Sequence, residues 1–230
     1  MQSDTADLEL LLAAITGIAW TIVYIDAIRV GFQQKTFAMP LATLALNFAW
    51  ELTYSAVDLR TAVNDPTANN VAWALVEIVW AIFDIAIVYT FFRFGRSEFP
   101  SVPRSALVGG AVLAFLVSVA LQVLFIAEFG AAVGVRYSAF LQTVVMSATF
   151  IAMYFARGGL RGQTLTIAIG KCIGTLAASI LYGIVEPSSF VLGLGVVCLV
   201  LDLVYIGLVV WAKRRPAISA VAGRSLVEIS

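Results

Sequence analysis

The stretch LNFAWELTYSAVD, residues 46–58, sets two carboxyl groups, Glu51 and Asp58, in an apolar background. A charged carboxylate at the centre of a bilayer costs roughly 2.5–3.5 kcal/mol. If this stretch crosses a membrane, its acids must face the interior of a helix bundle, where other groups compensate that cost. Whether it crosses one depends on the rest of the chain.

The composition of the whole chain is typical of an integral membrane protein. Of its 230 residues, 61% are hydrophobic and 12% are charged, and the mean hydropathy is +0.98. An ordinary soluble domain is about 25% charged, and a membrane-spanning helix needs about 20 mainly apolar residues. The sequence therefore predicts one all-α domain over residues 1–230, a polytopic bundle of seven transmembrane helices.

Apolar runs separated by polar, Gly or Pro residues mark the expected spans. They cover about 10–31, 39–59, 71–92, 105–127, 136–156, 163–185 and 189–212.

The distribution of basic residues supports this alternation. Eleven of the 14 Lys and Arg residues fall in loops on one side: Arg29, Lys35, Arg93, Arg96, Arg104, Arg157, Arg161, Lys213, Arg214, Arg215 and Arg224. Cytoplasmic loops carry an excess of Lys and Arg. We therefore expect the N-terminus outside or in the lumen, and the C-terminus in the cytosol.

Polar and aromatic side chains recur at helical spacing inside four of the expected spans. Residues that share a face of a membrane helix and are polar should point into the bundle. The stripes are, in chain order, Trp20 and Tyr24; Asn47, Trp50, Glu51, Tyr54 and Asp58; Trp73, Glu77, Trp80 and Asp84; and Asp202 and Tyr205.

Two of these acids are expected at similar depth. At a rise of 1.5 Å per residue, Glu51 and Asp202 differ in depth by only ~6 Å, so both could border one cavity near the middle of the membrane. For any one acid the alternative is a structural role, in an ion pair or a hydrogen bond to a neighbouring helix. Lys171 lies inside the sixth span and should neutralise an acid that the sequence does not identify, whereas Asp26 and Arg29 are expected to pair with each other.

An apolar, aromatic-lined cavity that holds carboxylic acids suits carbocation chemistry. A carboxyl group removed from water favours its protonated form, so it can donate a proton to an epoxide or an alkene, and aromatic faces stabilise the resulting cation by roughly 0.5–2 kcal/mol each. Other chemistries lack their residues: there is no histidine, no DDxxD or DxDD motif, and the two cysteines lie in apolar runs. No metal or cofactor is expected, and balanced charge gives no indication of nucleic acid binding.

The first part of the chain resembles a known family. Residues 19–55, AWTIVYIDAIRVGFQQKTFAMPLATLALNFAWELTYS, are similar to the integral-membrane terpene cyclases of fungal meroterpenoid and indole-diterpene pathways and their bacterial relatives. WAIFDI, residues 80–85, and LDLVYIG, residues 201–207, resemble two further elements of that family. The matching positions in the first part are Trp20, Tyr24, Ile28, Arg29, Gly31, Thr36, Ala38, Met39, Pro40, Leu41, Asn47, Trp50, Glu51 and Tyr54.

The resemblance implies proton-initiated cyclisation, without a metal, of a polyprenyl chain, often an epoxide, on a non-terpenoid head group. It also implies that Glu51 and Asp202 are essential acids, without deciding which of them delivers the proton. The expected partners are a prenylated substrate and the lipid bilayer, with no obligate protein partner. The membrane would be the cell membrane in a bacterium and the endoplasmic reticulum in a fungus.

The remaining candidate residues have expected supporting roles. Asn47 and Tyr54 would orient Glu51 by hydrogen bonds. The other candidates would line the cation path or stand behind it: Trp20, Tyr24, Trp50, Trp80, Asp84 and Tyr205.

Two other classes of function are alternatives. A small seven-span transporter also uses acids in the membrane, but the chain shows no internal repeat and its polar residues do not recur in matched halves. A scaffold protein would leave the Asn–Trp–Glu stripe without a purpose.

Overall fold

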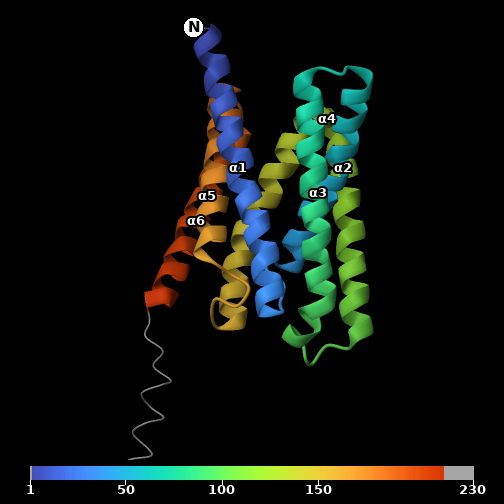
Figure 1. Cartoon of the computed structure of the whole chain (residues 1–230), viewed down its shortest axis with the longest axis vertical. Coiled ribbons are helices and arrows are strands. Elements are labelled where there is room, and N and C mark those ends of the chain that lie inside the picture. Colours follow the sequence, from blue (N-terminus) through green and yellow to red (C-terminus); the bar gives the residue numbers. More distant parts are fainter. Residues whose placement is uncertain (1, 215–230) are drawn as a thin grey trace, which may run out of the picture.

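The computed structural model describes residues 2–214, and every regular element in that range is helical. Figure 1 shows the helices side by side in one bundle, with the N-terminus at the opposite end from the last residues of α6. The elements are α1 (Gln2–Gln34), α2 (Leu41–Asn64), α3 (Ala68–Phe94), the short 3-10 helix η1 (Gly95–Glu98), α4 (Arg104–Arg157), α5 (Leu165–Ile180), the π-helical turn η2 (Leu181–Val185) and α6 (Ser189–Arg214).

The predicted all-α membrane class agrees with these helices. Among the described residues, five helices are long and apolar enough to cross a membrane: α1, α3, α4, α5 together with η2, and α6. α2 is not one of them, because polar residues such as Asn47 and Glu51 lower its hydropathy. Arg215 and Arg224, two of the eleven basic residues expected on the cytosolic side, lie outside the described residues.

The fourth and fifth expected spans are joined in α4, which is 54 residues long. The expected loop between them, 128–135, is reduced to a break at Gly130, whose φ of 73° and ψ of 164° are not helical. Side chains other than hydrogen are strongly disfavoured at such a φ, so glycine permits a reversal within one residue.

The chain turns back at this break. A Cβ on Gly134 would lie 2.9 Å from the backbone oxygen of Phe125, so the two sides of the break are packed against each other. Figure 1 shows the two parts of α4 as separate rods, one green and one olive, that meet near the end of α2. The helical pattern of residues 104–157 therefore contains a hairpin.

Small residues bring α1 and α5 close together. A Cβ on Gly170 would lie 2.8 Å from the Val23 side chain, and one on Gly174 would lie 2.9 Å from the ring of Trp20. Small residues four apart commonly allow such close packing of membrane helices. This contact fixes the Trp20 ring against α5 and so sets one wall of the site described below.

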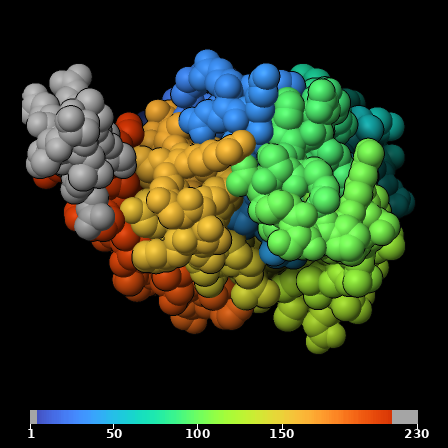
Figure 2. All heavy atoms as spheres, turned by 90° about the horizontal axis from the view of Figure 1, so that it is seen from below, coloured from blue at the N-terminus to red at the C-terminus, as the bar shows by residue number. Residues whose placement is uncertain are grey.

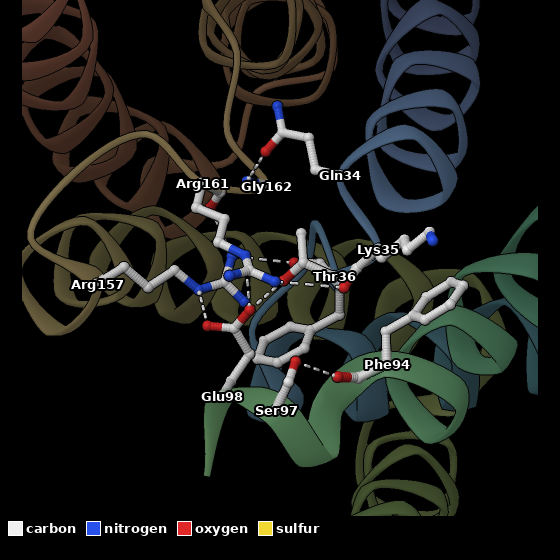
Figure 3. A network of polar contacts seen from close by, with 10 residues as sticks. Gln34, Lys35, Thr36, Phe94, Ser97, Glu98, Arg157, Arg161 and Gly162 are labelled. Atoms are coloured by element: carbon white, nitrogen blue, oxygen red, sulfur yellow. Dashed lines mark hydrogen bonds and ion pairs between the residues drawn. The ribbon is translucent and has the colours of Figure 1, made fainter. Parts of the chain in front are cut away.

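A polar network ties three connections together at one end of the bundle (Figure 3). The Glu98 carboxylate of η1 lies 3.0 Å from the Arg161 guanidinium and 3.5 Å from that of Arg157, and it accepts a 2.7 Å hydrogen bond from Thr36. Arg157 also donates to the backbone oxygen of Phe37 at 3.0 Å, and its guanidinium lies over the Phe37 ring, 4.2 Å from the ring centre. Figure 2, viewed from this end, shows the same connections in blue, green and gold beside one another.

The expected pair of Asp26 and Arg29 is confirmed at the same end. An Arg29 nitrogen lies 2.5 Å from the Asp26 carboxylate. Thr164, the residue before α5, also donates a hydrogen bond to Asp26. The pair therefore links α1 to the start of α5.

Candidate functional site

A cavity of about 380 Å³ lies between the helices and extends from the middle of the bundle towards the end where α2 and η2 finish. Volumes of this order are typical of small-molecule sites. The end of the cavity in mid-bundle is walled by aromatic and polar side chains, namely Trp20, Tyr24, Asn47, Trp50, Glu51 and Trp80. Asp58, Trp73, Arg136 and Tyr182 line the part nearer the end of the bundle.

Glu51 is the central acid of this cavity. It is 3% exposed, and its Oε1 accepts a 2.8 Å hydrogen bond from the hydroxyl of Tyr24 on α1. Its Oε2 receives no hydrogen bond from an N–H or hydroxyl group of the described residues, and the neighbouring carboxyl group is that of Glu77. Tyr24 therefore holds one oxygen of Glu51, and the carboxyl group faces the cavity beside Glu77.

Asn47 holds Tyr24 in place and links it to Asp84. The side-chain nitrogen of Asn47 donates to the Tyr24 hydroxyl at 2.5 Å and to the Asp84 carboxylate at 2.8 Å. Asp84 is fully buried and does not line the cavity. Asp84, which was expected to support the site, therefore lies behind Asn47 and outside the cavity.

Tyr54 does not occupy the place expected for it. Its hydroxyl accepts a 3.5 Å hydrogen bond from Ser138 on α4, and it is absent from the cavity lining. Tyr24, from a different helix, makes the contact with Glu51 that was expected of Tyr54. Glu51 and Tyr54 are three residues apart and so point about 60° apart around the axis of α2, which lets Glu51 face the cavity while Tyr54 faces α4.

Two tryptophans of the cavity, Trp50 and Trp80, are fixed by hydrogen bonds from their indole nitrogens. Trp80 donates to the Thr21 hydroxyl at 3.0 Å, and Trp50 donates to the backbone oxygen of Val135 at 3.1 Å. The rings of Trp80 and Tyr24 are stacked with their centres 6.1 Å apart. With the N–H groups satisfied elsewhere, these residues present mainly ring carbon to the cavity.

Asp202 lies in a different environment from Glu51. Its Oδ1 is 2.6 Å from the Nζ of Lys171, and the two side chains are 1% and 0% exposed. Lys171 also donates a hydrogen bond to Ser147. Asp202 is thus the acid that Lys171 neutralises, and it does not line the cavity that holds Glu51.

The ion pair lies about one helical turn beyond the wall of the cavity. Thr143 and Thr175 line the cavity, and each is four residues from a member of the buried cluster, Ser147 and Lys171 respectively. One turn of helix corresponds to about 5.4 Å. Tyr205 is fully buried against Phe150, with the ring centres 5.4 Å apart, and likewise does not reach the cavity.

Several polar residues of the cavity were not among the site residues expected from the sequence, and Glu77, Gln142 and Thr175 are three of them. Glu77 is 5% exposed and neighbours Glu51, and the stripe it shares with Trp73 and Trp80 was the available signal. Gln142 and Thr175 also line the cavity. Ser138 precedes Gln142 by four residues, and Lys171 and Ser179 flank Thr175 at the same spacing, so polar residues at helical spacing were the available signal here as well. Among the residues that the structure describes, no group of three or more Asp, Glu, Cys or His side chains is arranged to hold a metal ion.

Comparisons with known proteins agree on one family. The family model described as Pyr4-like transmembrane terpene cyclases matches residues 4–215. Terpene cyclase pyr4 of Aspergillus fumigatus is 25% identical over 211 residues, which cover 86% of this chain and 84% of that protein. Terpene cyclase terB of Tolypocladium album is 28% identical over 170 residues, or 71% of this chain and 66% of the relative.

A shorter match has a higher identity. The Pyr4-family terpene cyclase mfmH of Annulohypoxylon moriforme is 35% identical over 91 residues, which are 40% of this chain and 34% of mfmH. This match therefore spans about a third of that relative, whereas the match to pyr4 extends over most of both chains.

Proposed function

We propose, from the premise that this chain belongs to the family of Pyr4-like transmembrane terpene cyclases, that it protonates and cyclises a prenylated substrate inside the membrane. The observation that carries the proposal is the cavity wall around Glu51, where Tyr24 holds one carboxyl oxygen and the carboxyl group lies beside that of Glu77 without a basic partner. The relatives are named terpene cyclases, and their names give the reaction class alone.

The proposed topology has seven crossings of the bilayer. α4 contributes two, because its residues turn back at Gly130, and α2 contributes one, because its 24 residues suffice for a span and pack between α3 and α4. The connections rich in Lys and Arg meet at one end (Figure 2), which we assign to the cytosol by the positive-inside rule. The N-terminus is then outside or in the lumen. We keep the assignment of the cell membrane for a bacterial source and the endoplasmic reticulum for a fungal one.

Glu51 is the proposed proton donor. Its O–H bond breaks as the proton moves from Oε2 to an epoxide oxygen or a terminal alkene carbon of the substrate. Opening of the epoxide, or addition to the alkene, leaves a tertiary cation, which neighbouring double bonds attack to close the rings. A final C–H bond loses its proton to a carboxylate, so the product is an isomer of the substrate.

The neighbours of Glu51 suit this cycle. Glu77 lines the same cavity beside it, and two adjacent buried carboxyl groups avoid carrying two negative charges by retaining a proton. Glu77 can accept the last proton and return it to Glu51. Tyr24 and Asn47 hold the donor in position, which is the role of an orienting group in general acid catalysis.

The aromatic walls account for the fate of the cation. Trp20, Trp50 and Trp80 line the cavity, and a ring face stabilises a nearby cation by roughly 0.5–2 kcal/mol. Their bulk also excludes water, which would otherwise trap the cation before the rings close. A transporter would need neither cation stabilisation by ring faces nor exclusion of water at the bottom of a cavity.

Asp202 remains proposed as essential, with a role that differs from that of Glu51. Because Lys171 occupies one of its oxygens and the cavity does not reach it, we assign it a positioning role. It holds Lys171, and through it Ser147 of α4, just beyond the wall formed by Thr143 and Thr175. Glu51 is then the acid that acts on the substrate.

The reaction is tested by feeding linear substrates to cells that express the chain in a host without related pathways. A prenylated phenol and its terminal epoxide should each be offered, and cyclic products of unchanged mass sought by mass spectrometry. The chain and its Glu128→Gln variant should form such an isomer, because Glu128 is exposed and outside the cavity. Absence of any isomer from every substrate, with the protein present in the membrane, would refute the proposed reaction.

A further inference from the structure

Two buried polar atoms on the α4 and α5 walls of the cavity have no partner. Gln142 on α4 is 7% exposed and Thr175 on α5 is 4% exposed, and both line the cavity. Neither Oε1 of Gln142 nor Oγ1 of Thr175 has a hydrogen-bond partner in the described structure. The mechanism above uses neither residue. Buried polar groups in proteins are almost always hydrogen-bonded, so these two atoms require an explanation.

These atoms and the acids are on different walls of the cavity. Glu51 and Glu77 belong to α2 and α3, which pack against each other. Thr175 belongs to α5, which packs against α1 and α6, and Gln142 belongs to α4, which packs against α2 and α6. Thr175 precedes the end of η2 by about 10 residues and Glu51 precedes the end of α2 by about 13, which places them about 15 Å and about 20 Å from the same end of the bundle. The two walls therefore meet the cavity at nearly the same depth.

The chemistry of the two atoms restricts what can satisfy them. The carbonyl oxygen of an amide side chain accepts hydrogen bonds and cannot donate one, and a threonine hydroxyl can do both. A polyprenyl chain has no donor, and an epoxide oxygen is an acceptor alone. On a prenylated substrate, a donor for Gln142 can come only from an O–H or N–H of the non-terpenoid head group.

We propose that Gln142 and Thr175 form a subsite that binds a hydroxyl of the substrate's head group. This inference rests on the proposed function and specifies its substrate class, a prenylated compound whose head group bears a free hydroxyl, such as a phenol. The head group docks on the α4 and α5 wall, and the prenyl chain folds across the cavity so that its reactive end meets Oε2 of Glu51. Gln142 and Thr175 are positioning residues for the head, and the proton transfer stays with Glu51.

The test compares two substrates that differ in one donor. An epoxidised farnesyl phenol and its phenol methyl ether share the chain and the ring, but the ether cannot donate to Gln142. Wild-type protein should prefer the phenol by about tenfold in kcat/KM, the order of one hydrogen bond. Gln142→Leu and Thr175→Val should each reduce that preference, mainly by raising KM for the phenol, while turnover of the ether stays within about twofold.

Matched control variants are available in the same chain. Gln122 is 1% exposed and its Oε1 is also unpartnered, but it does not line the cavity, so Gln122→Leu should keep the wild-type preference. Thr53 bonds to the backbone oxygen of Ala49 and is outside the lining, so Thr53→Val should keep it as well. A second readout, independent of turnover, is the thermal stabilisation that each compound gives to a Glu51→Gln background.

The outcomes separate this inference from the proposed function. If wild type forms cyclic isomers but Gln142→Leu and Thr175→Val retain its preference for the phenol, the subsite is wrong and the cyclase proposal stands. If both substrates lose activity equally in these variants, the two residues hold a water molecule or support packing, and the inference is again overturned. If wild type cyclises neither compound nor any plain prenylated phenol, the proposed function itself fails.

Discussion

Two acids buried in the middle of the bundle, Glu51 and Asp202, have opposite surroundings. Asp202 is paired with Lys171 at 2.6 Å and has no access to the cavity. Glu51 has no basic partner, receives one hydrogen bond from a neutral hydroxyl and faces the cavity. The difference indicates that an unpaired membrane acid is maintained for chemistry, and a paired one for structure.

The largest effect is expected from removing the acidic proton of Glu51. Glu51→Gln keeps the side-chain volume and an oxygen that can accept from Tyr24, but it cannot protonate the substrate. General acid catalysis contributes about 10²–10⁴-fold, so turnover in membranes should fall by at least about 100-fold, with a thermal midpoint close to that of wild type. Retention of more than half of the turnover would assign the donor role to another residue.

Asp202→Asn, unlike Glu51→Gln, should act mainly on the stability of the protein. The change leaves the Lys171 ammonium without its counter-charge at 0% exposure, and breaking a buried pair in this way costs about 3–5 kcal/mol. The thermal midpoint in detergent, and the amount of protein recovered in membranes, should both fall clearly.

A double variant separates the two roles that Asp202 could have. Replacing the pair by Lys171→Met and Asp202→Leu removes both charges, which is often neutral for stability. Recovery of both the midpoint and the turnover would confirm that Asp202 acts through Lys171. A stable but inactive double variant would contradict the comparison, because it would show that the Asp202 carboxylate is needed for the reaction itself.

The sequence indicated how deep a side chain lies in the bundle better than it indicated which neighbouring helix that side chain faces. The stripe of Trp20 and Tyr24 reaches the cavity, and so do all members of the α2 stripe except Tyr54. That exception shows that one polar face can border both a cavity and a neighbouring helix. Asp202 was placed at the right depth, but helical rise does not tell which neighbour a side chain faces, and Lys171 lies on that side.

Gln142 and Thr175 illustrate the other limit of sequence reasoning. Lys171, Thr175 and Ser179 stand four residues apart on α5, but such a pattern does not tell whether each member faces a cavity or a neighbouring helix, because that depends on how the helices pack. The break at Gly130, in contrast, lies inside the loop expected at 128–135, and only its reduction to one non-helical residue was not predicted.

A pair of tyrosine variants sharpens the contrast at Glu51. Tyr24→Phe removes the donor to Oε1 and leaves Asn47 with one partner fewer, so turnover should fall by about tenfold, the order of one hydrogen bond. Tyr54→Phe removes only a 3.5 Å contact with Ser138 and should leave turnover within about twofold. Equal losses in the two variants would mean that the orientation of Glu51 does not depend on Tyr24.

The smallest effect is expected at Trp80, and it concerns the product more than the rate. Phenylalanine keeps an aromatic face but has a weaker attraction for cations, and the loss of the indole N–H frees Thr21. A difference of about 0.5–1 kcal/mol corresponds to a two- to fivefold loss of turnover, together with a changed ratio of cyclic isomers, because the space beside the Tyr24 ring increases. Trp211→Phe, at an exposed residue outside the cavity, is the control and should change neither quantity. If Trp80→Phe also changed neither, the ring of Trp80 would not contact the cation, and the unpaired acid at Glu51 would have to act without aromatic support on that side.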